Sequence, residues 1–211
     1  MINILITDDH PILRKGLRQL LEDDKHKRFG FIDEAVNGSE LIEKLISFDF
    51  NIVLLDISLP GRNGLELLSD IRKIKPDIPV LMLSTYSEDQ YAIRALKLGA
   101  SGYLTKATAA EELIAAVVKV AGGSRYITAS LAEKITYNFF DEPAKPLHGE
   151  LSVRELEVTI HLASGKTMSN IAKELSLSPN TISKYRERIL AKLKLKTTSD
   201  IIRYAINEGL V

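Results

Sequence analysis

The sequence contains no cysteine among its 211 residues. This absence excludes a disulfide scaffold, a thiolate nucleophile, and any zinc or iron–sulfur site with cysteine ligands. No apolar run approaches the roughly 20 residues that a membrane-spanning helix needs. The apolar N-terminus has no basic residue before it and stops at Asp8 and Asp9, so we expect no signal peptide. These features predict a cytoplasmic protein without membrane association.

Net charge is also absent, since 28 Lys and Arg residues balance 28 Asp and Glu residues. The balance conceals two unlike parts. Residues 1–120 hold 15 basic and 18 acidic side chains, whereas residues 149–211 hold 10 basic and seven acidic ones. The neutral total is a cancellation between an acidic and a basic part, and it excludes no class of partner.

Residues 1 to about 120 alternate short apolar runs with amphipathic segments of helical length. The runs are Ile2–Thr7, Phe31–Val36, Ile52–Leu55, Val80–Ser84 and Gly102–Thr105. The helical segments are Ile12–Leu21, Glu40–Phe48, Leu65–Ile74, Gln90–Leu98 and Glu111–Val120. Runs that are apolar almost throughout are typical of parallel strands covered on both faces. The pattern predicts a doubly wound α/β domain with a five-stranded parallel sheet.

The domain boundaries follow from where this alternation stops. We predict an α/β domain over residues 1–121, a partly helical linker over residues 122–148 and a small all-α domain over residues 149–211. The stretch Asp141–Pro146 contains two prolines and little that a core could bury, which is typical of a linker.

Carboxylates follow two of the predicted strands. Asp8 and Asp9 close the first run, and Asp56 closes the third. Ligands of open α/β sheets bind beyond the carboxyl ends of the strands, and these two ends are neighbours in a doubly wound order. Three like charges repel, and a Mg²⁺ ion with oxygen ligands would compensate them. Each site alone also fits a simpler interpretation, a helix start or a turn, but their coincidence favours the metal.

Two further strand ends extend this group. The fourth run ends at Ser84, and Lys106 follows the fifth. A lysine ammonium can pair with a phosphate, and a carboxylate that attacks phosphorus forms an aspartyl phosphate. Acids, a metal, a hydroxyl and a lysine together predict a site for a phosphoryl group, with Mg²⁺ and the lysine balancing the developing charge.

The constellation resembles the receiver domain of two-component response regulators, a flavodoxin-like fold, over residues 1 to about 120. The resemblance is carried by Asp8-Asp9, the stretch from Asp56 to Gly64, Ser84 and Lys106. It implies that Asp56 accepts a phosphoryl group from a phosphohistidine of a sensor histidine kinase. It also implies that Asp9 and Asp56 ligate Mg²⁺ directly, Ser58 through its backbone carbonyl and Asp8 through water.

The same resemblance assigns a switch. Ser84 would move toward the phosphate, Tyr103 would rotate inward with it, and Lys106 would pair with the phosphate. On pattern alone, an aromatic residue at a strand end is more often part of the core. The residue after Lys106 is Ala107, where many receivers have a proline preceded by a cis bond. Because a cis bond before any other residue is costly, we expect a trans bond or a rearranged loop. The sequence gives His10 no role.

Residues 151–211 carry a helical pattern. Ser152 and Glu155 form a predicted capping box at a helix start. A short helix over Thr167–Leu175 precedes a three-residue turn, and Ser178 can cap a next helix that runs from Pro179 to about Lys194. Two short helices joined in this way predict a helix-turn-helix.

The second of these helices is basic. Residues 184–196 hold one acid, Glu187, against six cations: Lys184, Arg186, Arg188, Lys192, Lys194 and Lys196. A run of charge is more often a solvated helix face, but the helix-turn-helix spacing favours binding to the phosphates of DNA.

This part resembles the LuxR-type domain of the NarL/FixJ family, and the run Thr181–Tyr185 is more similar to the BvgA/EvgA branch. The resemblance implies base contacts from Ser183, Lys184 and Glu187. Other residues implied to face DNA are Asn180, Thr181, Arg188, Lys192, Lys194 and Lys196. The last helix, Thr198–Asn207, resembles the dimerisation helix of the family, with Ile201, Ile202 and Ala205 on its apolar stripe.

The sequence therefore predicts a response regulator that regulates transcription as a dimer on double-stranded DNA, with RNA polymerase as a candidate further partner. We expect no enzyme activity beyond Mg²⁺-dependent phosphotransfer and autodephosphorylation. One alternative is an enzyme that turns over aspartyl phosphate, for which no substrate pocket is evident in the sequence. Another is an interaction module whose C-terminal domain binds protein, which absent or salt-independent DNA binding would favour.

Overall fold

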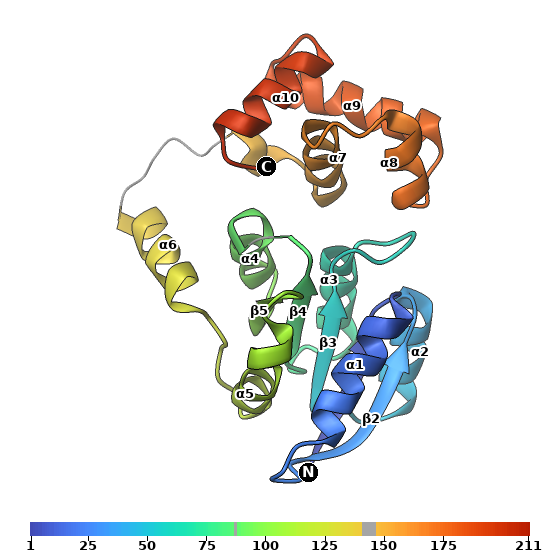
Figure 1. Ribbon diagram of the computed structural model, residues 1–211, viewed down its shortest axis with the longest axis vertical. Coiled ribbons are helices and arrows are strands. Elements are labelled where there is room, and N and C mark those ends of the chain that lie inside the picture. The colour runs from blue at the N-terminus through green and yellow to red at the C-terminus, as the bar shows by residue number, and fades with distance from the viewer. Residues whose placement is uncertain (87, 141–146) are drawn as a thin grey trace. The chain divides into compact units, whose positions relative to one another are not determined.

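The computed structural model describes residues 1–86, 88–140 and 147–211 (Figure 1). The predicted linker Asp141–Pro146 lies outside these described residues. The chain divides into two compact units, Met1–Ile135 and Thr136–Val211, and each is described by itself. No helix among the described residues has both the length and the apolar character needed to cross a membrane.

The first unit is built on a parallel sheet, as predicted. Its strands are β1 (Ile2–Thr7), β2 (Phe29–Ala35), β3 (Ile52–Asp56), β4 (Val80–Ser84) and β5 (Gly102–Thr105). They lie in the order β2-β1-β3-β4-β5, and every neighbouring pair is parallel. The register pairs Thr7 with Leu55 and Asp56 with Leu83. The carboxyl ends of β1, β3 and β4 therefore meet at one edge of the sheet.

Five helices connect and cover the strands (Figure 1). They are α1 (Pro11–Glu22), α2 (Gly38–Ser47), α3 (Gly64–Ile74), α4 (Glu88–Lys97) and α5 (Ala109–Ala121). Right-handed crossovers place α1 and α5 on one face of this strand order and α2, α3 and α4 on the other. The contacts agree, since α1 packs on α5 and α2 packs on α3. The sheet is thus doubly wound, as predicted.

The core between sheet and helices explains why the strands are almost wholly apolar. The side chains of Ile4, Ile6 and Leu54 are completely buried, as are those of Leu113 and Val117 from α5. Burying one such side chain stabilises the fold by about 1.5–3 kcal/mol. Because both faces of the central strands are covered, polar side chains are found mainly at the strand ends, which is where the candidate site lies.

The chain that follows α5 returns to the sheet. The Tyr126 amide donates to the Ser101 carbonyl at 2.9 Å, and Tyr126 forms an isolated parallel bridge with Gly102. A Cβ atom at Gly102 would lie 2.9 Å from Tyr126 Cβ, so glycine permits this approach. Helix α6 (Ala129–Phe140) follows. No cis peptide bond occurs among the described residues, so Ala107 follows a trans bond, as expected.

The second unit is helical. It contains a 3₁₀ turn, η1 (Leu147–Glu150), and the helices α7 (Val153–Ala163), α8 (Met168–Glu174), α9 (Pro179–Leu193) and α10 (Thr198–Asn207). The predicted capping box is present, because Ser152 and Glu155 each accept the other's backbone N–H. Ser178 caps α9 by accepting from the Thr181 amide. The helix-turn-helix prediction for α8 and α9 is confirmed.

Candidate functional site

The predicted carboxylates come together at the carboxyl edge of the sheet. Oxygen atoms of Asp8, Asp9 and Asp56 and a ring nitrogen of His10 lie within 4.8 Å of one another. Asp8 and Asp56 are fully buried, while the Asp9 side chain is 32% exposed. The positions follow from the register, because β1 and β3 are paired neighbours that end side by side.

Lys106 reaches this cluster from the end of β5. Its Nζ atom lies 2.7 Å from both Asp8 Oδ2 and Asp56 Oδ2. Burial and the charge of Asp8 raise the pKa of Asp56 to about 6, although Lys106 acts in the opposite direction. Burial would lower the pKa of Lys106, but Asp56 and Asp8 outweigh it and hold that pKa above its usual value. The ammonium therefore stays charged and offsets part of the repulsion.

One ammonium does not neutralise three carboxylates. Asp9 Oδ1 is buried and accepts no hydrogen bond from the described residues, although His10 Nδ1 lies 2.9 Å away. A buried carboxylate oxygen without a donor is costly unless a cation approaches it. The three acids offer only oxygen atoms as metal ligands, and oxygen is the ligand type that Mg²⁺ prefers. The residues present therefore fit the predicted metal.

The loop after β3 brings backbone groups to Asp56. The Ser58 amide donates to Asp56 Oδ1 at 3.2 Å, and the Gly64 amide donates to the Ile57 carbonyl at 2.8 Å. A Cβ atom at Gly64 would lie 2.1 Å from the Asp56 carbonyl oxygen. Glycine is thus required for α3 to begin this close to the Asp56 backbone. Asn63 fixes the same helix start by accepting from the Leu65 amide.

Ser84 and Tyr103 both bond to the backbone of Tyr86, in the loop between β4 and α4. Ser84 Oγ accepts from the Tyr86 amide at 3.0 Å, and the Tyr103 hydroxyl donates to the Tyr86 carbonyl at 3.0 Å. Tyr103 is fully buried, so its side chain already points inward. Burial raises the pKa of Tyr103, which keeps its hydroxyl a donor. The two predicted switch residues are thereby joined to one short loop.

The predicted DNA-facing residues lie on or near α9. Those that the structure leaves exposed are Asn180, Lys184, Glu187, Arg188, Lys194 and Lys196. Thr181 and Ser183 are half-buried, and the Thr181 hydroxyl lies 2.8 Å from Ser178 Oγ within the helix cap. Arg188 lies over the Tyr185 ring, 5.9 Å from its centroid. Six of the nine predicted contact residues are therefore accessible, either on α9 or just beyond its end.

Lys192 is engaged inside its own domain. Its Nζ atom donates to Glu155 Oε2 at 2.6 Å and to the Glu150 carbonyl at 3.2 Å. It therefore joins α9 to the start of α7. Its contact with DNA stays a prediction. The spacing of basic residues in the sequence did not reveal the bond from Lys192 to Glu155.

The predicted dimerisation residues need a correction. Ile201 and Ala205 are fully buried in the core that α10 forms with α7 and α9, so neither side chain can contact a second copy. Ile202 is half-buried and Ile206 is 56% exposed. The accessible face of α10 is a shallow hollow lined by Ser199, Ile202, Arg203, Ile206 and Asn207. The sequence showed one apolar stripe and could not separate its buried positions from its accessible ones.

Comparison with known families finds a match in each of two separate parts of the chain. Residues 4–118 match the response regulator receiver domain, and residues 149–205 match the luxR family of bacterial regulatory proteins.

Curated relatives match over the full chain. Response regulator UvrY of Escherichia coli K12 is 32% identical over 100% of this chain and 96% of its own length. Response regulator GacA of Pseudomonas protegens is 31% identical over 100% and 98%. Among solved structures, Salmonella enterica RcsB bound to promoter rprA with phosphomimetic BeF₃⁻ matches with a TM-score of 0.64 and 27% identity, covering 97% of this chain and 98% of that one.

The chain belongs to the NarL/FixJ family of response regulators, which join a receiver domain to a LuxR-type helix-turn-helix. It is a DNA-binding regulator of transcription in two-component signalling. The more specific placement in the BvgA/EvgA branch stays a prediction.

The bond between Lys192 and Glu155 predicts a pH-dependent stability. Burial would raise the pKa of Glu155, but hydrogen bonds from Lys192 and Ser152 outweigh it and lower that pKa. The contribution of the pair is thus present above the unfolded pKa of about 4.3 and is lost as the pH falls through the lower folded value. Lys192→Ala should destabilise the domain by about 1 kcal/mol at neutral pH. The loss should shrink below about pH 4.

Hydrogen exchange of the α9 amides, measured at neutral pH and below about pH 4, reports this stability for the C-terminal unit alone. Lys184→Ala, an exposed lysine of the same helix, is the matched control and should change little. An equal loss at neutral and acid pH would contradict the assignment.

Proposed function

We propose that Asp56 accepts a phosphoryl group from a phosphohistidine of a sensor histidine kinase. An Asp56 oxygen attacks the phosphorus, the phosphorus–nitrogen bond breaks, and the imidazole leaves with the electron pair of that bond. The observation that carries this proposal is the environment of the carboxylate. Asp56 is held by the Ser58 amide on one oxygen and by Lys106 on the other, and Lys106 would balance charge on the transferred group.

Mg²⁺ completes this proposal. Asp9 and Asp56 would hold the ion directly, Ser58 through its backbone carbonyl and Asp8 through water. When bound, the ion supplies positive charge that offsets both the carboxylates and the incoming phosphoryl oxygens. The chain's own activity would then be limited to phosphotransfer and autodephosphorylation.

The signal would leave the site through Tyr86. Phosphorylation adds about two negative charges, and a phosphoryl oxygen would accept the Ser84 hydroxyl hydrogen and draw Ser84, which accepts from the Tyr86 amide, toward the phosphate. Because Tyr103 also bonds to Tyr86, a shift of Ser84 would move a loop to which both side chains are attached. The proposed bistable element is therefore the start of α4 together with the end of β5.

The output is proposed to be a dimer on paired half-sites about one DNA turn apart, formed in the cytoplasm where the DNA lies. Helix α9 would enter the major groove. The accessible face of α10, which contains Ile202, would meet its counterpart. RNA polymerase is proposed as a further partner at the promoter.

Phosphotransfer tests the first step. Incubation with a small acyl phosphate and Mg²⁺ should add one phosphoryl group to the peptide that contains Asp56, as measured by mass spectrometry. Asp56→Asn should abolish this label because the attacking oxygen is replaced by an amide. Asp49→Asn removes a fully exposed carboxylate of the same domain and should leave the label intact. A label that persists in Asp56→Asn would refute the assignment.

DNA binding tests the second step. Lys184→Ala should reduce discrimination between operator sequences, because Lys184 is proposed to contact bases. Lys194→Ala should weaken binding to all sequences alike and lower the slope of log affinity against log salt by about one unit. Fluorescence anisotropy with specific and unrelated duplexes at several salt concentrations separates the two. Identical behaviour of both variants would contradict the assigned roles.

A further inference from the structure

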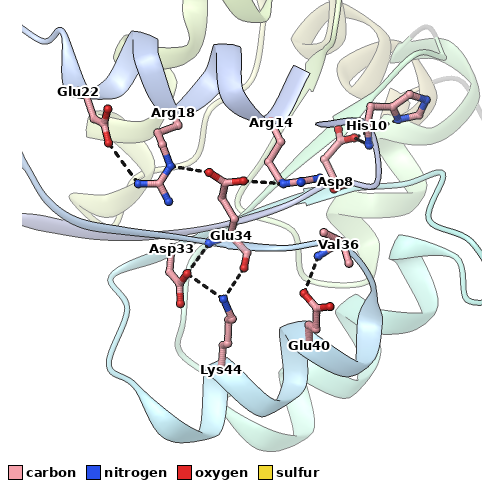
Figure 2. Close-up of polar contacts among 10 residues, drawn as sticks. All are labelled: Asp8, His10, Arg14, Arg18, Glu22, Asp33, Glu34, Val36, Glu40 and Lys44. Atoms are coloured by element: carbon pink, nitrogen blue, oxygen red, sulfur yellow. Dashed lines mark hydrogen bonds and ion pairs between the residues drawn. The ribbon is translucent and has the colours of Figure 1, made fainter. Parts of the chain in front are cut away.

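Arg14 makes two directed bonds beside the carboxylate cluster (Figure 2). It lies in the first turn of α1, and its side chain is only 11% exposed. Its Nη1 atom donates to the backbone carbonyl of Asp8 at 2.7 Å, and its Nε atom donates to Glu34 Oε2, also at 2.7 Å. One side chain thus joins the strand end that carries Asp8 to the neighbouring strand β2.

A hydrogen bond to the Asp8 carbonyl also affects the position of Asp9. The peptide unit between Asp8 and Asp9 is planar and rigid, so a donor that fixes this carbonyl also fixes where the Asp9 backbone begins. The Asp8 carboxylate is held separately, because its Oδ1 accepts from the His10 amide at 2.7 Å. Arg14 and the His10 amide together define the path of the turn that carries two of the three acids.

Glu34 holds the guanidinium in position (Figure 2). It pairs with Ile6 in the register of β1 and β2, and Arg18 Nε bonds its second carboxylate oxygen. Burial would raise the pKa of Glu34, but the bonds from Arg18 and Arg14 outweigh it and lower that pKa. The carboxylate therefore stays ionised and compensates the charge of Arg14, which would otherwise disfavour a cation at the cluster nearby.

We propose that Arg14 is a positioning residue for the carboxylate cluster. Its bond to the Asp8 carbonyl, supported by Glu34, orients the peptide between Asp8 and Asp9 and so sets the affinity of the cluster for Mg²⁺. This inference rests on the proposed metal site. It differs from an ordinary surface ion pair, which is exposed and contributes little, because Arg14 is nearly buried and bonds the backbone next to a proposed ligand.

Arg18 offers a matched control. It lies on the same helix, carries the same charge and bonds the same glutamate, but its other partner among the described residues is Glu22 rather than Asp8. A general effect of losing a cation from α1 would appear in both arginine variants. An effect of positioning would appear only when Arg14 is changed.

The first measurement is Mg²⁺ affinity by isothermal titration calorimetry of the full-length chain. Arg14→Ala should raise the dissociation constant about tenfold, as removal of partners that orient metal ligands commonly does. Arg18→Ala should change it less than about twofold. Glu34→Gln keeps the side-chain shape and should weaken binding as well. Wild-type affinity in both Arg14→Ala and Glu34→Gln would overturn the proposal, and Glu34→Gln alone decides if Arg14→Ala does not fold.

The second measurement needs no metal. The His10 amide reports the order of the turn, because it donates to Asp8 Oδ1. Its hydrogen exchange in the metal-free chain should accelerate in Arg14→Ala and stay unchanged in Arg18→Ala. If the wild-type chain binds no Mg²⁺, the metal site of the proposed function fails. The exchange result still decides the positioning role: equal rates in Arg14→Ala and wild type would refute it.

Discussion

Repulsion between three carboxylates at one edge of a parallel sheet is the constraint on which the rest of the receiver depends. Asp8 and Asp56 are fully buried there, with Asp9 beside them. Two unit charges about 4 Å apart interact with roughly 4 kcal/mol at the effective dielectric of a protein surface. Lys106 relieves part of this repulsion by contacting two of the acids. The remaining negative charge favours a cation at this edge, and the proposed phosphoryl transfer would require one.

Carboxylates that repel one another must be held in place, and the residues that hold them take no part in the proposed phosphotransfer. Gly64 lets α3 begin against the Asp56 carbonyl. Arg14 and Glu34 join the turn after β1 to β2. On the opposite side, Tyr86 accepts and donates bonds that reach Ser84 and Tyr103. The turn that carries Asp8 and Asp9 is thus held by fixed bonds, whereas Ser84 and Tyr103 are bonded to a loop whose movement is the proposed route of the signal.

The sequence predicted much of this because strand ends are visible in it. Each apolar run of the first domain became a strand, and parallel pairing then brought Asp8, Asp56 and Lys106 together. What it could not predict depends on packing between distant segments. The bond from Arg14 to Glu34 spans 20 residues. In the sequence Lys192 cannot be distinguished from the other basic residues of α9, because its bond to Glu155 depends on how α7 and α9 pack. Ile201 and Ala205 were wrong as dimer contacts because an apolar stripe does not reveal which partner covers it.

If the acids repel one another until a cation is bound, neutralising one of them should stabilise the metal-free chain, and the thermal stability of Asp9→Asn tests this most directly. Asp9 lies beside the His10 ring but pairs with no lysine or arginine among the described residues, so its neutralisation removes repulsion at little cost. Without divalent cations the variant should melt at a higher temperature than the wild type. Mg²⁺ should then raise the melting temperature of the wild type markedly and that of the variant little. A metal-free variant that melts below the wild type, or equal stabilisation of both chains by Mg²⁺, would contradict the account.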